Sequence, residues 1–139
     1  MCYKASMNKP ALVLLLLAQP AIACDWRVTE SVDPMTDARK CLIYSPTAKL
    51  GIGVANGAVT FAAPSAYHHD GLEVRVDDLP SILLDRDART TAAYGSDARD
   101  LLALILTGQR IRTHYLSYPA SVSGDAPICT LPALIESCR

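Results

Sequence analysis

The chain has 139 residues, of which 13 are basic and 14 acidic, and half of them are hydrophobic. A net charge of −1 argues against a nucleic-acid-binding protein, which needs a basic surface to neutralise phosphates. The length suits a single domain with one hydrophobic core.

The first 23 residues have the three parts of a secretory signal peptide. Two lysines precede a short apolar run at residues 11–18, and alanines stand three positions and one position before Cys24. The run is far shorter than the roughly 20 residues that a membrane-spanning helix needs. We therefore expect cleavage of residues 1–23 and a single globular domain at 24–139, which is periplasmic or secreted. Loss of both lysines would bring the net charge to −3.

Four of the five cysteines follow this leader, namely Cys24, Cys41, Cys129 and Cys138. An even number in an oxidising compartment suggests two disulfides. A short helix expected between the last two would place them near its opposite ends, too far apart for a bond unless the chain doubles back. We favour links between the N-terminal pair and the C-terminal pair, with Cys41–Cys138 as the first expectation, while the other connectivities stay open.

Cys24 also allows a second interpretation. The segment Ala21–Cys24 loosely resembles a bacterial lipobox, in which the cysteine is acylated and tethers a lipoprotein to the outer or inner membrane. The usual leucine three positions before the cysteine is missing, and acylation would leave an odd number of thiols. Simple cleavage is favoured, and the lipoprotein stays as the alternative.

Alternating hydrophobic and polar residues between turn-forming residues predict a chain made mostly of short strands. The first two strands flank the turn Asp33–Asp37, so we expect them to pair as a hairpin. In the fifth strand the aliphatic residues should face inward, with Glu73 and Arg75 outward. The expected strands are Trp26–Val32, Cys41–Ser45, Leu50–Val54, Ala58–Ala62, Leu72–Asp77, Ser81–Leu84 and Ile111–Leu116.

The periodicity changes at Ser96, a good helix N-cap, because the apolar residues of Leu101–Ile105 form the stripe of an amphipathic helix. Gly108 follows as the expected C-cap residue. A short C-terminal helix is expected over Leu131–Glu136. The predicted fold is mostly β and β-sandwich-like, with these two helices, and α+β is the alternative.

His68, His69 and Asp70 form the most conspicuous cluster of candidate metal ligands. Together with His114 they would suit a small metal-dependent hydrolase. However, neighbouring residues on an extended chain point to opposite sides, and the segment has the composition of an exposed loop. The chain contains none of the motifs G-x-S-x-G, H-E-x-x-H, P-loop or dinucleotide fingerprint. We therefore expect no catalytic residues, no metal and no cofactor.

Arg110, Arg112 and His114 alternate along one predicted strand, so their side chains should share one face. Such a face is either an ordinary exposed polar surface or a small anion-binding strip.

Four aspartates flank the turn that follows the fifth strand, namely Asp77, Asp78, Asp85 and Asp87. They lack the ligand order of a calcium loop, and paired catalytic carboxylates need set distances that a sequence does not supply, so we interpret them as residues of solvated loops.

The order of these segments resembles that of known small secreted proteins. The similarity is carried by the leader and by Trp26–Val28, Asp33–Asp37, Cys41–Ser45, Leu72–Asp77, Gly108–Thr113 and Leu131–Cys138. This layout is similar to proteobacterial β-sandwich proteins of the invasion-associated locus B type and to the type VI secretion-associated VasI proteins. The chain lacks the cysteine directly after the first strand and the mid-chain Gly-Cys of the locus B pattern.

The resemblance implies a periplasmic or secreted accessory protein that is not an enzyme. The expected function is therefore an exported, disulfide-stabilised domain that binds an unidentified protein or envelope component. No nucleic acid is expected as a partner, and a membrane only if Cys24 is acylated.

Overall fold

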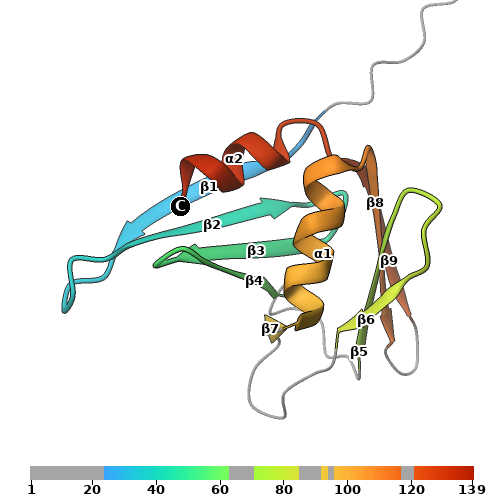
Figure 1. The fold of residues 1–139 in the computed structure, drawn as a ribbon, viewed down its shortest axis with the longest axis horizontal. Helices are drawn as coiled ribbons and strands as arrows, with labels where there is room; N and C mark the ends of the chain where they lie inside the picture. The colour runs from blue at the N-terminus through green and yellow to red at the C-terminus, as the bar shows by residue number, and fades with distance from the viewer. Residues whose placement is uncertain (1–23, 63–70, 85–91, 94–95, 117–120) are drawn as a thin grey trace, which may run out of the picture.

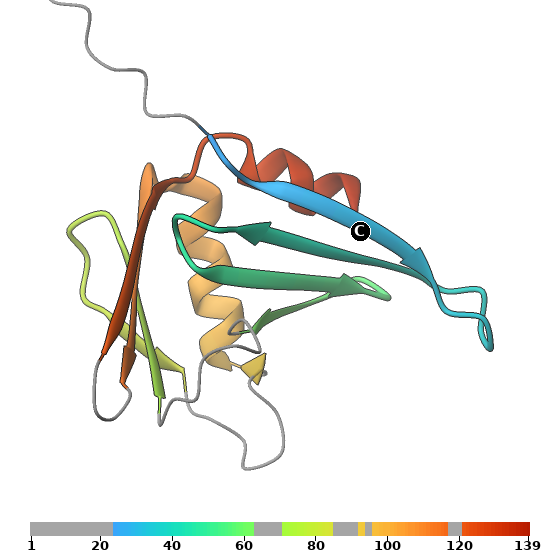
Figure 2. The same ribbon diagram turned by 180° about the vertical axis from the view of Figure 1, so that it is seen from behind.

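The computed structural model describes residues 24–62, 71–84, 92–93, 96–116 and 121–139, which form two antiparallel sheets and two helices (Figures 1 and 2). The first sheet has, in spatial order, β1 (Arg27–Val32), β2 (Arg39–Ser45), β3 (Leu50–Ala55), β4 (Ala58–Ala62) and β7 (Ala92–Ala93). The second sheet has, in spatial order, β6 (Ile82–Leu84), β5 (Gly71–Val76), β8 (Arg110–Leu116) and β9 (Val122–Pro127). The helices are α1 (Ser96–Thr107) and α2 (Leu131–Ser137). The β-sandwich-like α+β fold expected from the sequence is confirmed.

The alternating pattern of the strands determines which side of each sheet is buried. β1 and β2 pair as the expected hairpin, and Ile43 of β2 lies opposite Ile52 of β3 with both side chains fully buried. In β5 the aliphatic residues are buried, while Glu73 and Arg75 on the other face are partly exposed, as predicted. The inner faces of the two sheets therefore supply the core, and their outer faces carry most of the charged residues together with a few exposed aliphatic ones such as Leu42 and Leu83.

Helix α1 stands between the two sheets in both ribbon views (Figures 1 and 2). It packs against β4 of the first sheet and against β5 and β6 of the second. Its apolar stripe is buried as expected, with Leu101 and Ile105 fully inaccessible. Gly108 follows the helix but does not adopt the left-handed conformation of a typical C-cap glycine. A glycine is needed there because an added Cβ would lie 2.3 Å from Val76 Cγ1.

The sequence analysis did not predict β9, and it also missed the two-residue strand β7. The β9 sequence, Val-Ser-Gly-Asp-Ala-Pro, is rich in turn-forming residues, so local propensity argues against a strand. β9 forms because it pairs with β8 along its whole length and is covered on its other edge by the turn between β2 and β3.

We refer to the contact of residues 46–49 with β8 and β9 as the sheet junction. The backbone N–H of Asp125 donates to the carbonyl of Thr47 at 3.0 Å, so the turn extends the hydrogen bonding of β9. The buried hydroxyl of Thr113 donates to the carbonyl of Ala48 at 2.5 Å, and the hydroxyl of Tyr115 donates to that of Lys49. The junction thus fixes the first sheet to the second through backbone groups.

Two disulfides join the N-terminal half to the C-terminal segment, as the sequence analysis favoured. Cys24 is bonded to Cys129 and Cys41 to Cys138, over sequence separations of 105 and 97 residues. The second bond holds α2 against β2. This pairing indicates an oxidising environment outside the cytoplasm. Within the described ranges, no helix has both the length and the apolar character that crossing a bilayer requires.

Replacement of Gly124 by alanine should disrupt the sheet junction. An added Cβ would lie 2.1 Å from the carbonyl oxygen of Ala48, a backbone atom that cannot rotate away. We expect Gly124→Ala to lower the free energy of unfolding by about 3 kcal/mol, measured by urea unfolding.

Gly71→Ala provides the matched control, because Gly71 is also a buried strand glycine of the second sheet. Its nearest obstacle is the flexible end of Leu83, at 3.3 Å, so the cost should stay below about 1 kcal/mol. Equal losses of stability in the two variants would contradict the role given to the junction.

Candidate functional site

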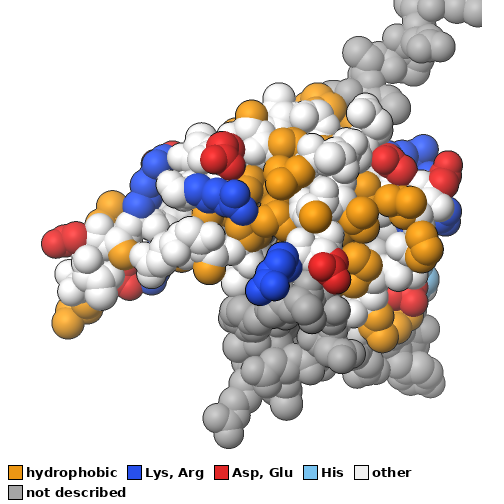
Figure 3. Space-filling view, in the orientation of Figure 1, with side chains coloured by type: hydrophobic (Ala, Val, Ile, Leu, Met, Phe, Trp, Pro, Cys, Tyr) orange, Lys and Arg blue, Asp and Glu red, His pale blue; other side chains and the backbone are white. Residues whose placement is uncertain are grey.

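The outer face of the second sheet carries an open pocket of about 740 Å³. Three strands and the turn between β2 and β3 build it, and charged side chains of both signs gather at this edge of the molecule (Figure 3). The polar residues that line it are Glu73 and Arg75 of β5, Ser81, Arg112, Thr113 and His114 of β8, Ser123 and Asp125 of β9, and Thr47 and Lys49 of the turn.

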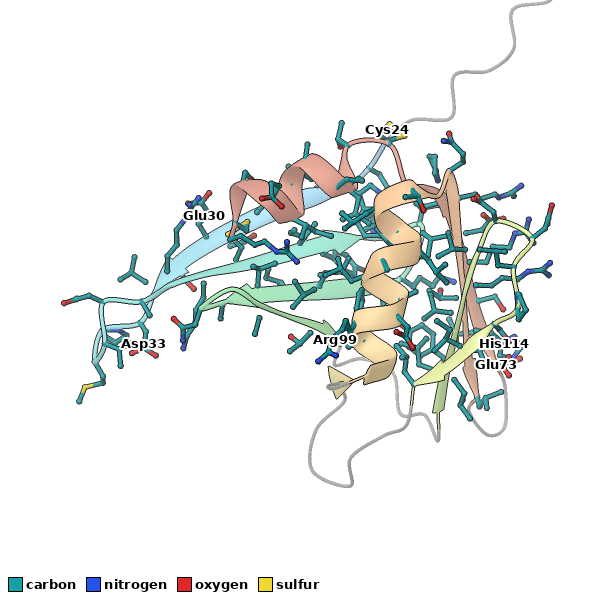
Figure 4. The ribbon with its side chains drawn as sticks, in the orientation of Figure 1. Cys24, Glu30, Asp33, Glu73, Arg99 and His114 are labelled. Carbon is teal, nitrogen blue, oxygen red and sulfur yellow. A yellow bond between two sulfur atoms is a disulfide. The ribbon has the colours of Figure 1, made fainter. Side chains whose placement is uncertain are left out.

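The strand register arranges these side chains in two rows across the sheet. In one row Arg75 lies opposite Arg112, which lies opposite Asp125. In the next row Glu73 lies opposite His114, and Figure 4 shows these two side by side. Because directly opposite residues have Cβ atoms about 5 Å apart, each row is a set of groups that can contact one ligand.

Arg75 and Arg112 form a pair of like charges, which by itself destabilises a sheet. The carboxylate of Asp78, in the turn after β5, lies 3.6 Å from Arg75 Nη2 and 3.7 Å from Arg112 Nη2. Both distances exceed hydrogen-bond length, and the Asp78 side chain is 91% exposed. The Nε of Arg75 also donates to the carbonyl of Leu79 at 3.0 Å, which orients its guanidinium group.

The structure places Arg110, Arg112 and His114 on the same outer face, but the guanidinium group of Arg110 is already hydrogen-bonded to Asp125. Its Nε and Nη2 donate to the two oxygens of Asp125 at 2.7 and 2.5 Å. These hydrogen bonds lower the pKa of Asp125 and outweigh its partial burial, and the charges of Arg110 and Arg112 lower it further. Of the three arginines on this face, Arg75 and Arg112 are therefore the two with open donors. Lys49 at the rim donates to the carbonyl of Ser123 at 2.7 Å.

Asp25 anchors the rim of the pocket. Its carboxylate accepts hydrogen bonds from the hydroxyl of Ser45 at 2.6 Å and from the backbone N–H and hydroxyl of Thr47, the former at 3.0 Å. Burial raises the pKa of Asp25, but the hydrogen bonds from Ser45 and Thr47 outweigh it, so the pKa lies below its usual value. The turn is thus held by a charged group on one side and by the sheet junction on the other.

The other sequence candidates contribute differently. His68, His69 and Asp70 lie outside the described residues, as do Asp85 and Asp87. Within the described ranges, no group of three or more His, Cys, Asp or Glu side chains is arranged to hold a metal ion.

Asp77 and Asp78, which were both interpreted as residues of solvated loops, have distinct roles. Asp77 accepts hydrogen bonds from the backbone N–H groups of Gln109 and Arg110, at 3.0 and 2.9 Å, and so joins the turn after β5 to the start of β8. Asp78 is exposed as expected, but it also lies beside both arginines of the pocket.

The sequence analysis missed Arg75 and Lys49 as members of this site, and it assigned Asp78 to a solvated loop without placing it beside the arginines. Alternation already placed Arg75 on the outer face of its strand, but only the pairing of β5 with β8 brings it opposite Arg112. Comparison with protein-family models, with curated proteins and with solved structures gave no significant match.

Asp25→Asn removes the charged group that anchors the rim and should therefore lower the free energy of unfolding in a pH-dependent way. A lowered pKa in the folded state stabilises the protein above the unfolded value near 3.9, and this contribution disappears as the pH falls through the folded value. We expect the variant to lose about 1–2 kcal/mol relative to the wild type at neutral pH and less as the pH falls toward 2.

Urea unfolding at the two pH values measures this difference. Asp37→Asn, a change at an exposed turn residue, is the control and should leave the stability unchanged at both pH values. A deficit of Asp25→Asn that is the same at both pH values would show that the charge of Asp25 does not contribute.

Proposed function

We propose that this chain is an exported, disulfide-stabilised accessory domain that binds an envelope component through the outer face of its second sheet and catalyses no reaction. The observation that carries the proposal is the open pocket on that face, lined by polar side chains. Its volume of about 740 Å³ lies within the usual range for ligand sites.

Several features support a binding role for this face. The pocket residues project from paired strands, which hold side chains more precisely than loops do. The core is formed by the opposite face of the same strands, so the polar face is available for recognition. The resemblance to the locus B and VasI proteins supports an accessory role in the bacterial envelope, and the absence of catalytic motifs from the sequence agrees with it.

The export part of the proposal rests on the leader and on the two disulfides. Acylation of Cys24 and its bond to Cys129 require the same sulfur atom, so this disulfide favours plain cleavage over the lipoprotein alternative. Cys24 lies at the end of the molecule where the described chain begins (Figure 4). Cleavage before Cys24 would leave it as the first residue of a freely diffusing periplasmic or secreted domain.

Intact-mass measurement of the protein isolated from its host tests this processing. The mass should correspond to a chain that begins at Cys24, and it should rise by about 4 Da on reduction, because each of two disulfides takes up two hydrogens. A mass increased by a diacylglyceryl group and an acyl chain would instead identify a membrane-tethered lipoprotein.

Site-specific photo-crosslinking in the host tests the binding face. Ser123 on β9 lines the pocket, and Ser31 on β1 is also an exposed serine on an edge strand, in the other sheet. With benzoylphenylalanine at position 123 we expect a discrete crosslinked envelope species that is absent when the probe is at position 31. The same crosslinking pattern from both positions would contradict the proposed binding face.

A further inference from the structure

The Arg75–Arg112 pair has unused hydrogen-bonding capacity. A guanidinium group carries five N–H donors, and Arg75 uses one of them for the carbonyl of Leu79. Arg112 donates no hydrogen bond to any residue that the structure describes, and its contact with Asp78 is an ion pair at 3.7 Å. Two half-exposed guanidinium groups that lie opposite each other are therefore ready to bind an oxygen anion.

Asp78 is poorly suited to be the final partner of these arginines. An exposed ion pair contributes little to stability, and at 91% exposure this carboxylate is almost fully hydrated. Arg110 and Asp125 on the same face show the alternative, a bidentate pair with distances of 2.7 and 2.5 Å. An oxyanion with matching geometry could form such bonds with Arg75 and Arg112 and would displace Asp78 at little cost.

The neighbouring row indicates what the oxyanion is attached to. Glu73, His114 and Ser123 lie two residues along their strands from the row of the arginines. Two residues of an extended strand span about 7 Å. A carboxylate accepts hydrogen bonds, and imidazole and hydroxyl groups both donate and accept them, so the row complements the hydroxyl groups of a sugar. An apolar group there would desolvate Glu73 without compensation. Among the described residues that line the pocket there is no Phe, Tyr or Trp, which disfavours a stacked nucleotide base.

We propose that Arg75 and Arg112 bind the oxyanion of a phosphorylated or carboxylated sugar, and that Asp78 holds this position until the ligand displaces it. The inference rests on the proposed function and specifies the ligand class of the same site. Asp78 then acts as an internal competitor, which lowers the affinity of the pocket for anions and reduces the repulsion between the two arginines when no ligand is bound.

Calorimetric titration of the purified protein with glucose 1-phosphate, glucuronic acid and glucose tests the ligand class. We expect binding of one or both anionic sugars and no detectable binding of glucose. Binding of the phosphate alone identifies a phosphorylated sugar, and binding of glucuronic acid alone identifies a carboxylated one. Equal binding of glucose and the two anions would overturn the proposal.

Variants of the three residues test the mechanism. Arg112→Gln should weaken binding at least tenfold, since a hydrogen bond to a charged group is worth about 1.5–3 kcal/mol, and Arg112→Lys should retain part of the affinity. Asp78→Asn should strengthen binding about two- to fivefold by removing the competitor. Arg27→Gln and Asp37→Asn, which change exposed residues of the other sheet and its hairpin, should have no effect.

The outcomes separate this inference from the proposed function. If Asp78→Asn binds no better than Asp37→Asn, Asp78 is not a competitor. Loss of binding in Arg112→Gln counts only if its urea unfolding matches that of Arg112→Lys, which shows that both variants are folded. If position 123 crosslinks an envelope species but neither anionic sugar binds, the proposed binding face stands and the ligand class is wrong.

Discussion

The sheet junction is the contact on which both the fold and the pocket depend. It holds the turn of residues 46–49 against β8 and β9 through backbone carbonyl groups, which accept from the hydroxyl groups of Thr113 and Tyr115 and from the N–H of Asp125. Such a close approach of two backbones needs a residue without a side chain, and Gly124 supplies it. The same turn forms one wall of the pocket, so the geometry of the site follows directly from the way the two sheets meet.

The two disulfides add covalent links between the N-terminal part of the described chain and the C-terminal segment that follows β9. Cys24–Cys129 brings the start of the described chain to the segment after β9, where Trp26 Nε1 also donates to the carbonyl of Pro127 at 2.9 Å. Cys41–Cys138 fixes α2 to β2. In the chain-entropy model a loop of about 100 residues contributes roughly 4–5 kcal/mol, but the second bond closes a shorter loop once the first exists. The rigidity of the pocket walls thus depends in part on an oxidising compartment.

Local patterns in the sequence were sufficient to predict most of the fold, but they could not predict which residues come together in the candidate site. Strands such as β5 and the buried stripe of α1 follow from periodicity, because each buried face recurs at the spacing of its own element. The favoured cysteine pairing followed from the length of a short helix. β9 could not be predicted, because its turn-forming residues become a strand only when β8 and the junction supply hydrogen bonds. Arg75 was predicted only to face outward, because its partner Arg112 on β8 is distant in the sequence and strand pairing cannot be derived from local patterns.

The distribution of charge on the outer face of the second sheet is the main support for the proposed anion site. A face adapted for stability alone would pair opposite charges, as Arg110 and Asp125 do with two short hydrogen bonds. Arg75 and Arg112 instead lie directly opposite each other and share the distant, exposed carboxylate of Asp78, and Arg112 also has Asp125 opposite it on β9. Two adjacent cations cost stability, and Asp78 recovers little of it. Because the Nε of Arg75 is also fixed by the carbonyl of Leu79, the repulsion is maintained in an ordered position, and such preorganised cationic groups are what the proposed anion site would need.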